Sequence, residues 1–319
     1  MLYPVLAVLG GFIALVWAAD RFVIGAAAVA HNSGVSPLVI GLTIVGFGTS
    51  APEMLVSSVA AYNGVANLSI GNAVGSNIAN IALVLGLAAM VNPLHIHQKV
   101  IGRELPVMIV VMIFAAGLMW DGELGRIDGI LLLAGLFVMI VFVVREGLQD
   151  SDEPPPELDE LPDGMSTGVA ILWIVVGLGA LLASSELLVW GATEVATFFG
   201  VSERVIGLTV VAFGTSLPEL AATLVAAKRG EHDIAVGNVV GSNVFNTLGV
   251  LGLPGVIRPG HAEPLVMRLD IPLMIGVSML LWILARALRP YRQVGRKRGA
   301  LLVLIYVGYV VGVYLYVGG

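Results

Sequence analysis

Residues 48–53 read Gly-Thr-Ser-Ala-Pro-Glu, and residues 214–219 read Gly-Thr-Ser-Leu-Pro-Glu. A second motif follows each of them: residues 71–80 read Gly-Asn-Ala-Val-Gly-Ser-Asn-Ile-Ala-Asn, and residues 237–246 read Gly-Asn-Val-Val-Gly-Ser-Asn-Val-Phe-Asn. The copies align without a gap at an offset of 166, and 25 of the 47 aligned positions that begin at Gly41 are identical. A repeat of this length predicts a fold of two similar halves.

The composition of the chain is that of a membrane protein. Of its 319 residues 58% are hydrophobic and only 12% are charged, and the mean hydropathy is +0.96. So few charged residues cannot coat a soluble globule of this size, so a soluble protein is excluded. The net charge of −6 argues against nucleic acid as a partner. The absence of cysteine excludes disulfides, thiolate metal sites and a Cys nucleophile.

Polar breaks divide the chain into ten apolar segments, each near the ~20 residues that a helix needs to cross a bilayer. Helix is the expected spanning state, because a single apolar segment in lipid must satisfy its own backbone hydrogen bonds. The first segment is expected to be an uncleaved span, since no basic residue precedes it as in a secretory signal. The ten segments are 3–30, 38–62, 68–91, 105–120, 126–146, 167–198, 204–227, 234–257, 269–288 and 299–317.

We therefore expect an all-α integral membrane protein, in which residues 1–148 form a first five-helix repeat and residues 167–319 form a second. Between them, residues 149–166 form an acidic linker with seven acidic residues, four prolines and no basic residue. This composition predicts a solvated, extended tether, and regulatory Ca²⁺ binding by its carboxylates is the alternative. Because each repeat has an odd number of spans, the second copy enters the membrane from the opposite face, and the repeats are inverted.

The loops on the two sides of the membrane differ in positive charge. Eleven Lys and Arg residues fall in the loops on the side of the linker, and four fall on the side of the termini, leaving aside Arg21 within the first span. The positive-inside rule therefore predicts that the linker is cytoplasmic and that both termini face out.

Two carboxylates are expected in the middle of otherwise apolar spans. An ionised Glu53 or Glu219 at that depth costs several kcal/mol unless something compensates its charge, so such residues are functional by default. The proline before each, Pro52 or Pro218, lacks an N–H and must break the helix, which frees main-chain carbonyls that are tolerated only beside a cavity or a ligand. The structural alternative is a carboxylate that caps a broken helix.

The atoms gathered at each break are all oxygens: hydroxyls, a carboxylate and freed carbonyls. Hard cations suit such a shell, and Ca²⁺, with its flexible shell of about 6–8 ligands, suits it better than Mg²⁺. Two Glu side chains neutralise one Ca²⁺ or two Na⁺, so binding of a third Na⁺ would leave a surplus charge and make exchange voltage-sensitive.

The neighbouring spans add polar side chains at helical spacing. Ser76 and Asn80 are four residues apart and therefore share a helix face, as do Ser242 and Asn246. They are candidate ligands, with interhelical hydrogen bonding as the alternative. The glycines at 71, 75, 237 and 241 are expected to serve tight helix packing.

Together the paired Gly-Thr-Ser-x-Pro-Glu motifs, each followed by Gly-Ser-Asn-x-x-Asn, resemble the α-repeats of the Ca²⁺/cation antiporter superfamily, on its sodium/calcium exchanger branch and of the bacterial type. The resemblance covers all ten spans. It implies ten transmembrane helices in two inverted five-helix repeats, with the ion site on the second and third spans of each half. It also implies that the long first and sixth spans slide as a gate, and it places the chain in the plasma (inner) membrane of a bacterium or an archaeon.

Carried over position by position, the resemblance implies five ion-binding side chains in each repeat. It further implies that the main-chain carbonyls of Gly46 and Ala212 occupy positions that bind Na⁺ in the family. Some members have Asp where Asn246 stands, so this chain has only two carboxylates at the centre. The implied side-chain ligands are Thr49, Ser50, Glu53, Ser76 and Asn80 in the first repeat, and Thr215, Ser216, Glu219, Ser242 and Asn246 in the second.

The sequence thus predicts a secondary active antiporter, not an enzyme, that exports Ca²⁺ in exchange for Na⁺ by alternating access at a midplane site. No cofactor is expected apart from the transported ions, and the bilayer is the expected partner, without an obligate protein partner. An H⁺-coupled antiporter is the alternative, because two facing carboxylates in a low dielectric can carry protons. A passive channel ranks lower because inverted repeats build alternating-access machines, and a hydrolase lacks a His base at matching depth or an HExxH motif.

Overall fold

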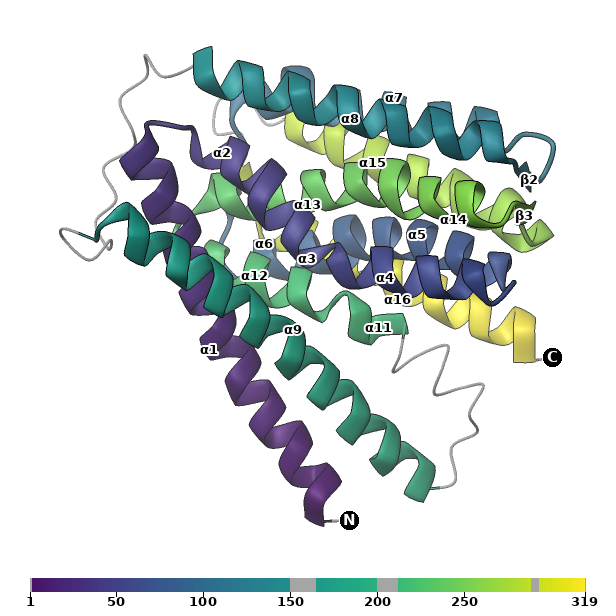
Figure 1. Cartoon of the computed structure of the whole chain (residues 1–319), viewed down its shortest axis with the longest axis horizontal. Coiled ribbons are helices and arrows are strands. Elements are labelled where there is room, and N and C mark those ends of the chain that lie inside the picture. Colours follow the sequence, from purple (N-terminus) through teal and green to yellow (C-terminus); the bar gives the residue numbers. More distant parts are fainter. Residues whose placement is uncertain (1, 150–164, 200–211, 288–292, 319) are drawn as a thin grey trace.

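The computed structural model of the chain describes residues 2–149, 165–199, 212–287 and 293–318. Most of the acidic linker and the first part of the expected span 204–227 lie outside these residues. The described part is built almost entirely of helices, as the composition predicts (Figure 1).

The first half begins and ends with long helices, and between them its spans are divided into shorter helices and π-helical turns. The elements are α1 (Leu2–Ser33), α2 (Pro37–Ile40), η1 (Gly41–Val45), α3 (Gly46–Thr49), α4 (Ala51–Tyr62), α5 (Ala66–Ala79), η2 (Asn80–Leu85), α6 (Gly86–Val91), β1 (Leu94–His95), η3 (Val100–Glu104), α7 (Leu105–Leu118), β2 (Glu123–Leu124) and α8 (Arg126–Gln149), where η denotes a π-helical turn.

From Ala212 onward the described residues of the second half follow the same order of elements as the first half, with nearly the same boundaries after a shift of 166. For example, π-helical turns begin at Asn80 and at Asn246, which are equivalent positions. The elements are α9 (Thr167–Phe198), α11 (Ala212–Thr215), α12 (Leu217–Lys228), α13 (His232–Phe245), η5 (Asn246–Val250), α14 (Gly252–Ile257), β3 (Gly260–His261), η6 (Val266–Asp270), α15 (Ile271–Arg286), β4 (Gln293–Val294) and α16 (Arg296–Gly318).

Membrane-length helices dominate the described residues. Eight of them are long and apolar enough to cross a bilayer, and the segments 37–49 and 51–62 make a ninth span if they are counted together. Those two segments meet at an angle of 41°. Pro52, the second residue of α4, has no N–H to continue the preceding helix, so the predicted break is present.

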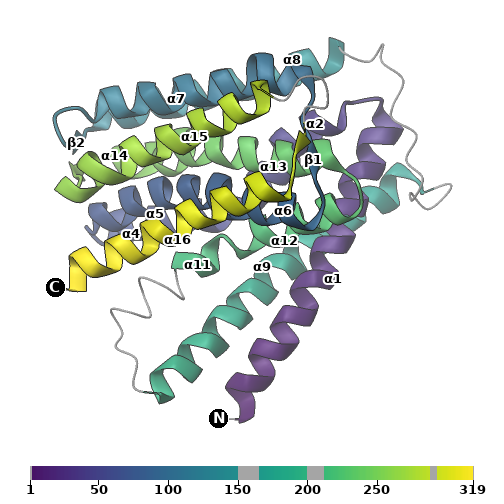
Figure 2. The same ribbon diagram turned by 180° about the vertical axis from the view of Figure 1, so that it is seen from behind.

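Helices α1 and α9 lie side by side and cross the other helices obliquely (Figures 1 and 2). They run antiparallel: the backbone at Gly25 approaches Ala170, and near the other end of α1 Gly11 approaches Ser184. An antiparallel pair of equivalent helices is what an inverted repeat produces. The guanidinium of Arg229, just after α12, donates to Asp20 Oδ1 at 2.8 Å and ties α1 to the helices beside it.

The core of the molecule lies around α13, in which all residues from Ile234 to Phe245 are buried. The last helix of each half also packs against the other half. Gly129 of α8 packs against the backbone of α14, and Gly299 of α16 packs against Gly86 of α6, the equivalent helix. These two contacts join the repeats independently of the linker.

Short strands connect loops that the expected course of the chain places on the same side. Strand β1 pairs with β4 and β2 pairs with β3, both antiparallel, and each pair joins the two halves. The side chain of Asn32, at the end of α1, donates to the carbonyl of Met165 just before α9. These contacts agree with spans that alternate in direction.

Candidate ion-binding site

The second span of the first half is interrupted at Ser50, between α3 and α4. The backbone of Ser50 has ψ near 1°, outside regular helix, and Pro52 follows as the second residue of α4. Thr49, Ser50 and Glu53 are all 0% exposed. The break therefore places two hydroxyls and a carboxylate within one turn, deep in the molecule.

The second repeat builds the same break at Ser216, where ψ is 5° and Pro218 again takes the second position of the following helix. Ser216 and Glu219 are buried, and Thr215 is half-buried. Ala212, whose carbonyl is a candidate ligand, is the first residue of α11.

The two breaks contact each other across the repeats. The hydroxyl of Ser50 donates to Glu219 Oε1 at 3.3 Å. Thr215 is the polar neighbour of Glu53 from the other repeat, and the carboxylates of Glu53 and Glu219 lie close enough to repel each other. Side chains that the sequence predicts from two distant stretches thus form one cluster.

The first break also packs tightly on α13. Thr49 Oγ1 lies 3.3 Å from Ser242 Oγ, and Ser242 Oγ donates to the Gly46 carbonyl at 3.4 Å. That carbonyl also accepts from the main-chain N–H of Ser50 at 3.1 Å. A Cβ at Gly46 would lie 3.0 Å from the Ser242 nitrogen, so glycine permits this close approach.

Four of the candidate ligands carry buried polar atoms that have no hydrogen-bond partner in the described part of the chain. These atoms are both carboxylate oxygens of Glu53, Oε2 of Glu219, and both amide atoms of Asn80 and of Asn246. Leaving a buried polar group unpaired costs about 1–3 kcal/mol, and more when the group is charged. Their recurrence at equivalent positions of the two repeats makes these four residues candidates for cation binding.

The hydrogen bonds of the first break give no support to helix capping as the role of Glu53. Glu53 and Glu219 lie in the first turns of α4 and α12, yet neither helix has a side-chain hydrogen bond at its N-cap. A capping carboxylate would accept from free N–H groups, whereas both oxygens of Glu53 lack a partner.

The candidate ligand atoms of the cluster are all hard oxygen atoms, and few of them carry a charge. Among the described residues no group of three or more His, Asp or Glu side chains is arranged to hold a metal ion. A cation bound here would therefore be shared by two carboxylates and by neutral hydroxyl, amide and carbonyl oxygens. Ser76, buried one turn before Asn80, and the equivalent Ser242 extend this neutral set.

Two asparagines next to the cluster were missed as functional candidates in the sequence. Asn72 donates through Nδ2 to the Glu53 carbonyl at 3.4 Å, and Asn238 donates to the Glu219 carbonyl at 3.3 Å. A signal was available, because each asparagine lies four residues before the Ser of its motif, on the same helix face.

The expected packing role of the glycines is present on α13. A Cβ at Gly237 would lie 2.8 Å from the Leu38 carbonyl oxygen, and a Cβ at Gly241 would lie 2.4 Å from that of Leu42. The equivalent of this contact in the other repeat would pair Gly71 and Gly75 with residues 204–208, which are outside the described residues.

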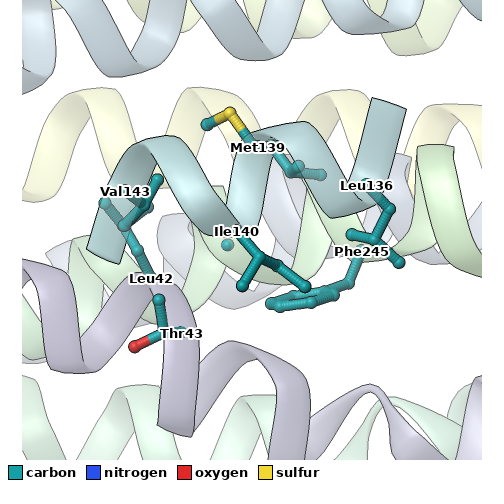
Figure 3. Close-up of a pocket in the computed structure, with 9 residues that line it drawn as sticks. Leu42, Thr43, Leu136, Met139, Ile140, Val143 and Phe245 are labelled. Atoms are coloured by element: carbon teal, nitrogen blue, oxygen red, sulfur yellow. The ribbon is translucent and has the colours of Figure 1, made fainter. Parts of the chain in front are cut away.

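A separate apolar pocket lies between η1, α8 and α13. Figure 3 shows Leu136, Ile140 and Val143 of α8 beside Leu42, Thr43 and Phe245, and Met139 also lines the pocket. No carboxylate lines this pocket, and its single hydroxyl, that of Thr43, donates to Val39 O within its own helix. It is therefore distinct from the polar cluster.

Comparison with known proteins places the chain among cation exchangers. The family model described as "Sodium/calcium exchanger protein" matches residues 3–145 and 169–315. The inner membrane protein YrbG of Escherichia coli is 41% identical over 92% of this chain and 91% of its own length. The sodium/calcium exchanger MaX1 of Methanosarcina acetivorans is 30% identical over 94% of this chain and 95% of its own.

Solved structures of the sodium-calcium exchanger NCX_Mj are similar over nearly the whole chain. One of them, soaked with Na⁺ and Sr²⁺, has a TM-score of 0.85 and 34% identity, and covers 97% of this chain and 98% of that one. These similarities and the helical architecture confirm the expected fold, an integral membrane protein of ten transmembrane helices in two inverted five-helix repeats.

Proposed function

Because the chain belongs to the sodium/calcium exchanger protein family, a family of cation antiporters, we propose that it exports Ca²⁺ across the membrane in exchange for Na⁺. The exchange would take place at the cluster around Glu53 and Glu219, with the neutral oxygens of both repeats completing the ion's shell. The similarity to the sodium/calcium exchanger MaX1 and to NCX_Mj supports these two ions as the cargo.

One observation carries the assignment of the site. The two Glu carboxylates, from equivalent positions, are buried together and repel each other, and three of their four oxygens have no hydrogen-bond partner in the described part. Two negative charges in a low-dielectric interior are costly unless they are neutralised. One Ca²⁺ or two Na⁺ would neutralise them, so both ions compete for the same oxygens.

Coupling follows from this charge balance. An empty site would hold two uncompensated carboxylates, which makes it too costly to bury away from water while the gate changes sides. A site filled by Ca²⁺ or by Na⁺ would be neutral and free to cross between the two access states. Exchange rather than leak is the expected result.

We further propose that α1 and α9 form the gate implied by the family resemblance. Their antiparallel packing lies outside the polar cluster and obliquely across the other helices (Figure 2). In this proposal α1 and α9 are the first helices of the two five-helix units, residues 1–148 and 167–319. The linker between the units would be cytoplasmic, and both termini would face out.

The test is Ca²⁺ uptake by proteoliposomes that contain the purified chain. Vesicles loaded with Na⁺ and diluted into Na⁺-free buffer with radioactive Ca²⁺ should accumulate it, and vesicles with equal Na⁺ on both sides should not. Uptake that ignores the Na⁺ gradient would reject Na⁺ coupling.

A second arm of the experiment addresses proton coupling, which the repulsion between the two carboxylates makes the nearest rival. A pH gradient without Na⁺ should not drive uptake if the proposal holds. Proton-driven uptake in Na⁺-free medium would assign the chain to H⁺ exchange at the same site.

A further inference from the structure

Asn238 lies at the centre of the contacts between the two repeats, although it is not one of the candidate ligands. It is on α13, is 0% exposed, and shares a helix face with Ser242 and Asn246 at intervals of four residues. Its side chain contacts three groups from two other elements, α12 and α3, and two of these groups belong to candidate ligands.

The orientation of the Asn238 amide is fixed by α12. Nδ2 donates to Thr223 Oγ1 at 2.8 Å and to the main-chain carbonyl of Glu219 at 3.3 Å. A carbonyl can only accept, so the NH₂ group must face α12 and the amide oxygen must face away from it. Thr223 is itself fully buried, which leaves the amide no water to turn toward.

The amide oxygen faces the first repeat. Asn238 Oδ1 accepts from Thr49 Oγ1 at 3.0 Å. The other carbonyl nearest to that hydroxyl, Val45 O at 3.1 Å, also can only accept. These acceptors hold the single proton of Thr49, and its lone pairs face a cation beside the contact with Ser242 Oγ at 3.3 Å.

Asn238 thus connects Thr49 of one repeat to Glu219 of the other through one rigid side chain. The hydrogen bond from Ser50 to Glu219 also crosses between the two breaks. The first repeat contains the equivalent donations: Asn72 donates to the Glu53 carbonyl at 3.4 Å and to Ser57 Oγ at 3.1 Å. The recurrence of both donations after 166 residues indicates a selected geometry rather than incidental packing.

We propose that Asn238 is a positioning residue that sets the separation of Thr49 and Glu219 and directs the Thr49 lone pairs into the ion site. The inference rests on the proposed function, because it assumes that the cluster binds the transported ion. Ca²⁺ needs about 6–8 oxygens at once, so its binding depends on ligands from both repeats being held in place beforehand.

The experiment measures Ca²⁺ affinity by calorimetry on the full-length, detergent-purified chain. Asn238→Ala should weaken Ca²⁺ binding about tenfold, the loss expected for one buried hydrogen-bonded link. The matched control is Asn92→Ala, which removes an Asn side chain that donates to the Ala227 carbonyl at the far end of the same helix α12. It should bind Ca²⁺ as the unmodified chain does.

A double-mutant cycle separates positioning from a general loss of stability. If Asn238 acts through Thr49, then Thr49→Val with Asn238→Ala should bind Ca²⁺ no more weakly than Thr49→Val alone. Losses that add in full would overturn the proposal, as would Asn238→Ala with affinity within about twofold of the unmodified chain.

Thr223→Val serves if Asn238→Ala does not fold. It keeps the shape of residue 223 and removes the acceptor that orients the amide, so a loss of about threefold in Ca²⁺ affinity is expected; unchanged affinity would count against the proposal. The two failures are distinguishable: an unmodified chain that binds no Ca²⁺ defeats the proposed function, whereas normal binding by both chains defeats only the role of Asn238.

Discussion

The hydroxyl of Ser50 donates a hydrogen bond to Oε1 of Glu219 over 3.3 Å, between residues that are 169 positions apart in the chain. The bond joins the broken second span of one repeat to the broken second span of the other. It makes the site a property of both halves together, because neither half alone brings a hydroxyl pair and two carboxylates to one point.

Removing either carboxylate charge should abolish exchange. Glu53→Gln and Glu219→Gln keep the side-chain volume but leave one negative charge, which cannot neutralise Ca²⁺. We expect Ca²⁺ uptake to fall at least about 100-fold, since each lost charge in a low dielectric costs several kcal/mol of ion binding. The measurement is Na⁺-driven Ca²⁺ uptake, after gel filtration has verified that each variant is folded.

Glu263→Gln is the control for this pair, because Glu263 is exposed in the loop between β3 and η6. It should exchange as the unmodified chain does. Full activity in Glu53→Gln or in Glu219→Gln would remove that Glu from the site.

Ser50→Ala should weaken ion binding without unfolding the protein. The change removes both a candidate ligand and the bond to Glu219, so a loss of about tenfold in Ca²⁺ affinity is expected. Ser58→Ala, on the same span, is the comparison, because its hydroxyl only donates to Met54 O within α4. Equal Ca²⁺ affinities for the two variants, measured by calorimetry, would contradict the assignment of Ser50.

Gly241→Ala should destabilise the site by separating two helices. A methyl group there would lie 2.4 Å from the Leu42 carbonyl oxygen. Overpacking of this kind costs about 1–3 kcal/mol, and the displaced η1 would carry Thr49 away from α13. We expect a lower thermal unfolding midpoint and weaker Ca²⁺ binding.

Gly276→Ala, in α15, tests whether this effect is specific to the contact, because no described atom lies within 4 Å of a Cβ at that position. It should leave the unfolding midpoint unchanged or slightly higher, since alanine favours helix over glycine. A similar fall of the unfolding midpoint in both glycine variants would show that the effect does not depend on the contact of Gly241 with Leu42.

Glu231, in the turn before α13, should make stability depend on pH. Burial and, to a smaller extent, the charge of Asp233 raise the pKa of its carboxyl from 4.5 to about 7, although Arg229 opposes the shift. The folded state therefore holds the proton more tightly than the unfolded state, so this contribution is fully present below about pH 4.5 and is lost as the pH rises through 7.

The unfolding midpoint of the chain should thus fall between about pH 5 and pH 8, and Glu231→Gln should flatten that part of the profile. The loss in free energy of unfolding is at most about 3 kcal/mol, the equivalent of the pKa shift. An identical pH profile for the unmodified chain and for Glu231→Gln would contradict this role.

The repeated motifs predicted the broken spans and the clustering of the two Glu side chains, because proline chemistry and the cost of a buried charge act locally. The side-chain contacts around the site were not predictable from the sequence. The spacing of Asn72 and Asn238 places them on the helix face of the motif Ser, but only the fold shows that their side chains donate to the Glu carbonyls. The π-helical turns that begin at Asn80 and Asn246 were likewise not predicted from the sequence.

The most direct test of the central claim is to locate the bound ion. A structure of the full chain determined with Sr²⁺, whose anomalous scattering marks its position, should show one strong peak that touches carboxylate oxygens of both Glu53 and Glu219, near the about 2.3–2.6 Å typical of Ca²⁺. A peak that contacts only one of the two residues, or that lies elsewhere in the molecule, would contradict the account.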